Sequence, residues 1–331
     1  MYCLLCLVHH GKAAHGVDVQ HVHTKLCSLY GCLRHGIGNV VVFKIKENFG
    51  ILHLDKIDDF WTTVGKKLLS NLEHSHMILE CHNKLPGFLK VFPPSYYRDR
   101  FASWDECNRF AARSFEDVIV HEDPDTVAGV LVEPIGNTGG IITPTDEYYR
   151  ILRQICDRYG VLLIFDEIIT GYGRTGAMFA AHSFGVTPDI ICGGKGLSSG
   201  MLPLGAMIAR QDLAEAFAGR PEERRNFAHG HTYAGNPLAC AVGLAVLEQI
   251  EAQGLANRAR ELGEYLAQRL EELKALGVVR EVRGRGLLRG VELVRDTRTL
   301  APFPQLGRML KRTALEHGLI LRVDPTWFAV A

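Results

Sequence analysis

The sequence predicts an α/β fold with a doubly wound, mostly parallel sheet and a smaller C-terminal α/β domain. Three observations after residue 100 predict it. Apolar runs of strand length alternate with helix-length amphipathic segments, the apolar runs are continuous, and ionisable residues stand at their C-terminal ends. A continuous apolar run is typical of a strand buried on both faces of a parallel sheet. Strand, helix and strand in this order predict right-handed crossovers.

The first predicted strand and helix lie in "DTVAGVLVEP" and "TPTDEYYRILRQICDRYG". The strand covers residues 130–132 and ends at Glu133. The helix begins with Thr143 as N-cap and Pro144 in its first turn, and apolar residues follow at helical spacing until Gly160 ends it. This pair predicts one crossover unit of the sheet.

Two further strands are predicted at "VLLIF" (161–165) and "PDIIC" (188–192). Ligands of doubly wound sheets bind outside the carboxyl ends of the strands. Glu133, Asp166 and Lys195 each stand at or just beyond such an end. We therefore expect these three groups to converge on one edge, although each taken alone is also compatible with a solvated loop charge.

The C-terminal part begins with a long amphipathic helix, "ANRARELGEYLAQRLEELKALG", which is expected to bridge to the second domain. "VREVRGRGLLRGVELV" then predicts two strands around a glycine-containing turn. Arg283, Arg285 and Arg289 in this stretch form either an anion site or a set of solvated turn charges. We expect a domain over 86–255 and a smaller one over 256–331.

Composition indicates a cytoplasmic globular protein with no affinity for nucleic acid or membrane. Of 331 residues 47% are hydrophobic and 22% charged, and Lys+Arg and Asp+Glu both total 37. No net charge therefore attracts the chain to polyanions. No apolar run approaches the ~18 residues of a membrane span, and "MYCLLCLVHH" lacks the basic start of a signal peptide. Nine cysteines without an export signal favour reduced thiols.

Residues 1–85 differ from the remainder of the chain. They hold five of the nine cysteines and ten of the fifteen histidines and lack long periodic segments. Cys3-x-x-Cys6 followed by His9 and His10 is a possible zinc pattern, but no second ligand pair has matching spacing. We therefore predict no metal site.

One lysine stands among glycines in "ICGGKGLSSG". Gly193, Gly194 and Gly196 surround Lys195, and glycine permits both unusual dihedrals and close approach of other groups. A surface turn would explain the pattern. The alternative is a reactive amine that meets a flat, bulky partner.

Two segments near this lysine resemble known binding motifs, but their spacing or neighbouring residues do not fit those motifs. "GYGRTG" (171–176) matches the dinucleotide fingerprint, but five residues separate it from the preceding strand, and no acidic residue ends the next strand. "GGKGLS" lacks the G-x-x-x-x-G-K-[ST] spacing of a phosphate loop. We therefore exclude NAD and a P-loop, which leaves imine formation as the chemistry of Lys195.

From about Leu85 to the end, the chain resembles the class III pyridoxal-phosphate-dependent aminotransferases, the ω-aminotransferase group. The resemblance rests on segments that occur in family order: "LVEPIGNTGGIITP", "LLIFDEIITGYGRTG", "PDIICGGKGLSSGMLPLGA", "HTYAGNPLACA" and "VRGRGLLRGVEL". It implies a fold-type I transferase, incomplete at both ends. It also implies a cytoplasmic homodimer that moves an amino group between an amine or ω-amino acid and a 2-oxo acid.

The resemblance also implies roles for five residues. Lys195 would bind pyridoxal phosphate as a Schiff base and move the proton between substrate and cofactor. Asp166 would pair with the pyridinium nitrogen, and Ile168 would pack on the ring face. Thr232 would donate to the cofactor phosphate of the neighbouring subunit. Glu133 would lie near the substrate. Glu167, next to Asp166, is expected to make a structural hydrogen bond, because adjacent strand residues face opposite ways.

Two features of the family pattern are not found. Its Gly/Ser-rich phosphate turn and its ring-stacking aromatic residue belong upstream of residue 85, and 1–85 contains neither. The chain also stops at "WFAVA", before the closing elements of the small domain, where some members place a carboxylate-binding arginine. We therefore hypothesise that 1–85 is foreign to the fold, from a mis-set reading frame or gene boundary.

Two other functions remain open from the sequence. The first keeps the fold and pyridoxal phosphate but changes the reaction to aminomutase, lyase or decarboxylase chemistry. The second is a non-catalytic remnant, which the missing phosphate turn favours and the presence of Lys195, Asp166 and Thr232 opposes.

Overall fold

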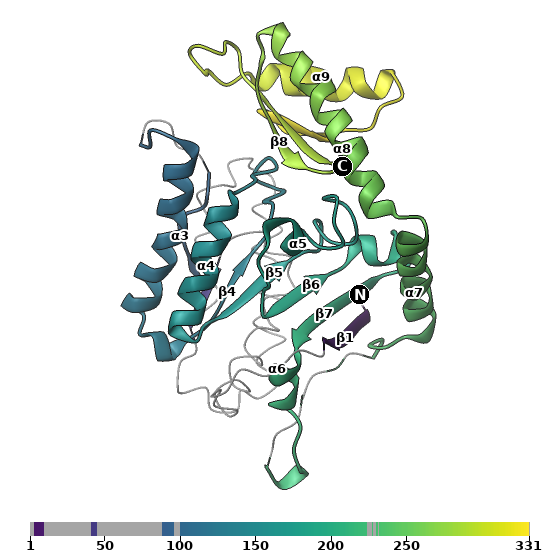
Figure 1. Cartoon of the computed structure of the whole chain (residues 1–331). Coiled ribbons are helices and arrows are strands. Elements are labelled where there is room, and N and C mark those ends of the chain that lie inside the picture. The colour runs from purple at the N-terminus through teal and green to yellow at the C-terminus, as the bar shows by residue number, and fades with distance from the viewer. Residues whose placement is uncertain are drawn as a thin grey trace, which may run out of the picture.

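The computed structural model describes residues 3–9, 41–44, 88–95, 100–223, 227, 230 and 232–330 (Figure 1), and for 3–9 and 41–44 it describes the backbone. The histidines and cysteines that suggested a zinc pattern have side chains outside these described residues. A large sheet occupies the lower part of the molecule, and a smaller domain lies above it.

The large sheet has seven strands in the order β1-β7-β6-β5-β4-β2-β3. In chain order its strands are β1 (Cys3–His9), β2 (Val41–Lys44), β3 (Phe88–Lys90), β4 (Val127–Val132), β5 (Leu162–Asp166), β6 (Ile190–Gly193) and β7 (Leu204–Arg210). The predicted strands correspond to β4, β5 and β6, so the α/β fold with crossover connections is confirmed.

The sheet is mixed, whereas the sequence predicted a mostly parallel one: the neighbouring pairs β4–β5, β5–β6 and β1–β7 are parallel, and the other three pairs are antiparallel. β4, β5 and β6 run parallel, but β7 is antiparallel to β6, and β2 is antiparallel to both β3 and β4. The connection from β6 to β7 covers residues 194–203. Parallel strands need a crossover of about a dozen residues or more, usually a helix. A connection this short therefore returns the chain in the opposite direction.

Helices cover the sheet and make the crossovers. They are α3 (Trp104–His121), α4 (Asp146–Tyr159), α5 (Ala180–Phe184), α6 (Gln211–Glu215) and α7 (Pro237–Ala252). The N-cap of α4 is Thr145, not Thr143: its hydroxyl accepts the backbone N–H of Tyr148. Gly160 ends the helix in the left-handed conformation, as predicted.

Two hydrophobic cores lie on the two faces of the large sheet. Val132 and Phe165 belong to the core beneath α3 and α4, whereas Leu131 and Ile164 belong to the core on the opposite face. Successive strand residues point to opposite faces. The side chain that follows Val132 and the one that follows Phe165 therefore leave the sheet on the second face.

The smaller domain is a four-stranded antiparallel sheet, in the order β10-β11-β9-β8, with two helices. Its elements are α8 (Leu255–Glu271), β8 (Val279–Arg285), β9 (Leu288–Leu293), α9 (Pro304–Glu316), β10 (Arg322–Val323) and β11 (Trp327–Val330). α8 runs from the large domain to the small one, as predicted for a bridging helix (Figure 1). Leu288 and Trp327 join the core beneath α3 and α4, so the two domains share apolar contacts.

Two short segments of 1–85 pair with the large sheet. β1 pairs with β7 at one edge, and β2 lies between β3 and β4. All other residues of 1–85 lie outside the described part of the chain. The hypothesis that 1–85 is foreign to the fold stays a prediction, as do the domain boundaries drawn from the sequence.

In the described ranges, no single helix has the length and apolarity to cross a membrane. α7 and the helical segment Leu255–Leu276 meet that test only as a pair, and the pair is bent by 63°.

Candidate active site

Three ionisable side chains meet at the carboxyl edge of the central parallel strands. Val132 of β4 pairs with Phe165 of β5, so Glu133 and Asp166 are the next residues at neighbouring positions of the same edge. Asp166 pairs in turn with Cys192 of β6, and Lys195 follows three residues later. The convergence expected from the strand ends is therefore present.

Glu133 is half-buried, and its carboxylate interacts with several charges. Burial raises the pKa of Glu133, and the nearby Asp166 charge raises it further. The backbone N–H of Asn137, which donates to Glu133 Oε2 at 2.9 Å, lowers it, as do the charges of Lys195 and Arg322. Glu133 therefore lies within electrostatic reach of the other two groups and of one further cation.

Asp166 has a similar environment with fewer donors. Burial raises the pKa of Asp166, while the backbone N–H of Ile168 and the charge of Lys195 lower it. The N–H of Ile168 donates to Asp166 Oδ1 at 3.1 Å. Within the described residues, no side chain donates a hydrogen bond to this carboxylate. Asp166 thus keeps acceptor capacity for a cationic or N–H group placed beside it.

Lys195 opens a short 3-10 turn (Lys195–Ser198) directly after β6 and Gly194. It has a φ of +43°, a region that costs energy for any residue other than glycine, and its side chain is exposed. Residues held in such conformations cluster at functional sites. Lys195 is therefore accessible to a small molecule, and its charge lies within reach of Asp166.

The glycines beside Lys195 make room for protein side chains. A Cβ on Gly193 would lie 2.1 Å from the hydroxyl oxygen of Tyr172, and one on Gly196 would lie 3.2 Å from Tyr172 Cβ. Gly194 faces Ile168, whose Cγ2 is 3.7 Å from the corresponding Cβ position. The close approach expected at these glycines is real, but the groups that approach are Tyr172 and Ile168.

Glu167 has the structural role expected from strand alternation. It is fully buried, and its carboxylate accepts hydrogen bonds from the hydroxyl of Thr170 at 2.7 Å and from the backbone N–H groups of Ala180 and Ala181 at 2.8 Å each. These contacts join the loop after β5 to the start of α5.

Arg322 is a site residue that sequence reasoning missed. It lies on β10 of the small domain, its guanidinium is 5.3 Å from the ring centroid of Trp327, and its charge lowers the pKa of Glu133. No motif marks it, because a single arginine in a short strand is common. Only the packing of the small domain on the large one brings it near Glu133.

The remaining predicted residues differ in placement. Ile168 lies beside Asp166 and Gly194, near the three converging groups. Thr232 is exposed in the turn that precedes α7, and among the described residues it makes no hydrogen bond to those groups. The roles of these residues toward a cofactor stay predictions.

The segment "GYGRTG" does not open a helix. Residues 171–176 form turns, and the next helix, α5, begins at Ala180 and has five residues. The segment instead contacts the β8–β9 hairpin: Leu287 N–H donates to Arg174 O at 3.0 Å. This geometry differs from that of a dinucleotide-binding turn.

A family model described as aminotransferase class III matches residues 67–326, so the match begins upstream of residue 85. The chain is 41% identical over 245 residues to a probable aminotransferase from Mycobacterium tuberculosis, which covers 72% of this chain and 52% of that protein. It is 40% identical over 212 residues to an omega-aminotransferase from Caulobacter vibrioides, with 64% of this chain and 48% of that protein covered. The chain thus spans about half the length of these relatives.

Solved structures show the same likeness. A crystal structure of the omega transaminase from Pseudomonas jessenii, in complex with PMP, superimposes with a TM-score of 0.72 at 36% identity, over 76% of this chain and 57% of that one. An (S)-enantioselective omega-transaminase from Thermomicrobium roseum covers 94% of this chain and 73% of its own, with a TM-score of 0.70 and 31% identity.

Proposed function

Since the chain belongs to the class III aminotransferase family, we propose that it acts as a pyridoxal-phosphate-dependent aminotransferase. It would move an amino group between an amine or ω-amino acid and a 2-oxo acid. The observation that carries the proposal is the meeting of Lys195 and Asp166 at one strand edge, each within reach of the other's charge.

The described residues fit pyridoxal phosphate. The cofactor requires an amine for its aldehyde and an anion for its ring nitrogen. Lys195 is an exposed amine on a backbone of positive φ, and Asp166 is a carboxylate with unused acceptor capacity. Thr232 is exposed and so is free to meet the phosphate on a neighbouring subunit.

When bound, pyridoxal phosphate supplies the carbonyl that takes the amino group and the ring that accepts electrons. Lys195 binds at Nζ and holds or returns a proton there. Asp166 would hold the cofactor at its ring nitrogen, where a negative charge would favour the protonated form of that nitrogen. Ile168 orients the ring by apolar contact.

Arg322 and Glu133 give the substrate side of the site one charge of each sign. A guanidinium binds a carboxylate with two parallel hydrogen bonds. We assign Arg322 to an anionic substrate carboxylate and Glu133 to the opposite, amine-bearing side. Because Glu133 and Arg322 lie within reach of each other's charge, an amine without a carboxylate is accommodated when the two residues neutralise one another.

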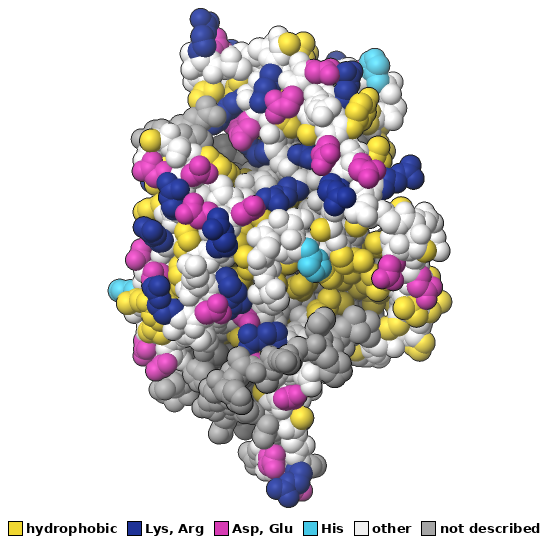
Figure 2. All heavy atoms as spheres, in the orientation of Figure 1, with side chains coloured by type: hydrophobic (Ala, Val, Ile, Leu, Met, Phe, Trp, Pro, Cys, Tyr) yellow, Lys and Arg dark blue, Asp and Glu magenta, His cyan; other side chains and the backbone are white. Residues whose placement is uncertain are grey.

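A homodimer is the second part of the proposal. Figure 2 shows hydrophobic side chains gathered on the flank where α7 lies. On α7 Leu238 is 66% exposed and Leu244 59%, Tyr233 just before α7 is 52% exposed, and Met201 in the loop after β6 is 73% exposed. Exposed apolar patches of this kind mark interaction surfaces. Sedimentation of the protein as a dimer, and of Leu244→Arg as a monomer, would support this surface; an unchanged dimer in the variant would place the contact elsewhere.

The function is tested by the visible spectrum of the purified protein mixed with pyridoxal phosphate, followed by borohydride reduction and peptide mapping. We expect a stable imine band and label on Lys195, and loss of both the band and multiple turnover in Lys195→Ala. Label spread over surface lysines, or turnover retained by Lys195→Ala, would remove the assignment. Amine donors and 2-oxo acids are then screened by turnover. Cytoplasmic localisation stays a prediction.

A further inference from the structure

A cavity lies between the two domains, apart from Lys195. Its volume is about 550 Å³, within the range of small-molecule pockets. It is formed where the "GYGRTG" loop and α5 of the large domain meet α8 and the β8–β9 hairpin of the small domain. Its walls consist of these residues: Thr175, Gly176, Ala177, His182, Ser183, Arg260, Glu264, Gly284, Arg285, Gly286 and Arg289.

The walls of this cavity carry an excess of positive charge. Three arginines line it, with Glu264 as the only carboxylate among the lining residues. Figure 2 shows Lys and Arg side chains interspersed with Asp and Glu in the region where the domains meet. Arg285 is already used, because it pairs with Asp146 and donates to Ser183 O at 2.9 Å.

The other two arginines have no carboxylate within ion-pair distance in the described part of the chain. Arg289 is half-buried and donates Nε to Gly286 O at 2.9 Å and Nη1 to Gly284 O at 2.7 Å, which leaves Nη2 without a described acceptor. The exposed side chain of Arg260, on α8, makes no hydrogen bond to a described residue. Burial lowers the pKa of Arg289, and the more distant charge of Glu264 only partly offsets this. An anion in the cavity would offset the cost of this burial.

We propose that this interdomain cavity binds a small multivalent anion, such as a phosphorylated or polycarboxylate metabolite, through Arg289 and Arg260. The two arginines come from β9 and α8, so the anion has cationic contacts on two elements. Charge-assisted hydrogen bonds from guanidinium groups suit phosphate and carboxylate oxygens in particular. The cavity shares no lining residue with the group of Glu133, Asp166 and Lys195.

Binding there would affect the contact between the hairpin and the large domain. Gly286 of the hairpin lies so close to the "GYGRTG" loop that an added Cβ would come within 2.4 Å of Thr175 C. The same loop places Tyr172 against Gly193 and Gly196, beside Lys195. An anion bound to Arg289 and Arg260 would lie against Thr175 and Gly176 of the loop, and would therefore stabilise the wall of the site that holds the lysine.

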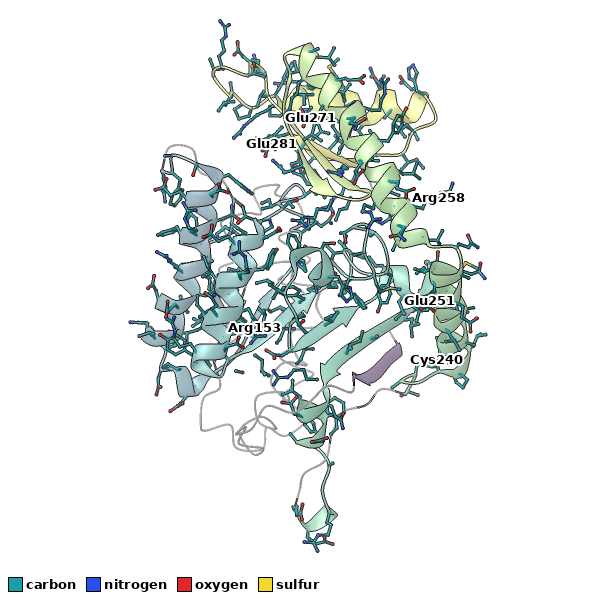
Figure 3. All side chains as sticks on the ribbon, viewed as in Figure 1. Arg153, Cys240, Glu251, Arg258, Glu271 and Glu281 are labelled. Carbon is teal, nitrogen blue, oxygen red and sulfur yellow. The ribbon has the colours of Figure 1, made fainter. Side chains whose placement is uncertain are left out.

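The experiment is calorimetric titration of the full chain with inorganic pyrophosphate at constant ionic strength, with and without saturating pyridoxal phosphate. We expect one saturable site in both conditions. Arg289→Met and Arg260→Met should each raise Kd by about tenfold or more, as expected for the loss of one charged partner. Arg258→Met is the matched control, because Arg258 lies on the same helix, does not line the cavity and points away from the body of the molecule (Figure 3). It should leave Kd within about twofold.

Arg260→Met keeps the test decisive if the loss of the Arg289 hydrogen bonds unfolds the hairpin. Absence of saturable binding would overturn the proposal, as would equal weakening by Arg258→Met, which indicates a general charge effect. Binding that disappears when pyridoxal phosphate is present would assign the pyrophosphate to the cofactor site and also overturn it. A rise in melting temperature on adding pyrophosphate, absent in Arg260→Met, would support it.

Discussion

Asp166 and Glu167 are adjacent carboxylates at the end of β5, and they have different surroundings. Burial raises the pKa of both. Asp166 accepts one backbone N–H and lies within reach of the charge of Lys195. Glu167 lies on the other side of the chain and is fully buried.

The difference lies in how many hydrogen bonds each carboxylate has made. Glu167 accepts three, from Thr170, Ala180 and Ala181, so its oxygens stabilise a loop. Asp166 keeps most of its acceptor capacity. Burial and a raised pKa are therefore shared by a structural and a candidate functional group, and the unused capacity separates them.

The largest expected effect comes from a substitution that tests whether Asp166 is functional. Asp166→Asn should lower kcat by about 10²–10³, because it removes a preorganised charge from the site. The imine band of Lys195 should remain. Turnover and absorbance are measured on the same preparation. An unchanged kcat would mean that another carboxylate pairs with the cofactor.

The variant Glu167→Gln tests whether the Glu167 carboxylate has a structural role. The amide nitrogen would face N–H or O–H donors in a fully buried position, which leaves at least one donor unsatisfied at a cost of about 1–3 kcal/mol. The free energy of unfolding, measured in urea without cofactor, should fall by that amount. Asp166→Asn should cause no such loss. Equal losses in the two variants would show that both carboxylates are structural.

The pH dependence of stability sharpens the comparison. The pKa of Asp166 in the folded state is raised above its ordinary value of 3.8. At pH values between the unfolded pKa and the folded pKa, the folded state therefore binds more protons than the unfolded chain. This contribution is complete below the unfolded pKa and is lost as pH rises through the folded one. The free energy of unfolding of the cofactor-free protein should therefore fall less between pH 4 and 7 in Asp166→Asn than in the wild type. Parallel curves would contradict the raised pKa.

The smallest effect concerns Tyr172. Its buried hydroxyl has no hydrogen-bond partner among the described residues. Tyr172→Phe should therefore leave the free energy of unfolding unchanged or raise it by up to about 1 kcal/mol. Tyr172→Ala, the control that removes the ring, should lower it by about 3–5 kcal/mol. A clear loss in Tyr172→Phe would show that the hydroxyl has a partner.

Much of the candidate site could be predicted because strand ends are local features. The apolar runs before Glu133 and Asp166 mark where β4 and β5 end, and alternation within a strand separates Asp166 from Glu167. The N-cap of α4 was displaced by two residues, because Thr143 and Thr145 both suit the position and only the backbone decides between them. The strand β7 was not predicted, and its direction depends on the length of the loop that follows β6.

The sequence by itself determined the succession of β4, α4, β5 and β6, the family, and the three ionisable groups at one sheet edge, since each depends on residues close together in the chain. Tertiary structure alone decided that Tyr172 lies against Gly193, that Arg322 reaches Glu133, and that arginines of the small domain line a cavity against the large one. These contacts join segments far apart in sequence. Their geometry depends on how the two domains pack, which cannot be predicted from the local periodicity of apolar residues in the sequence.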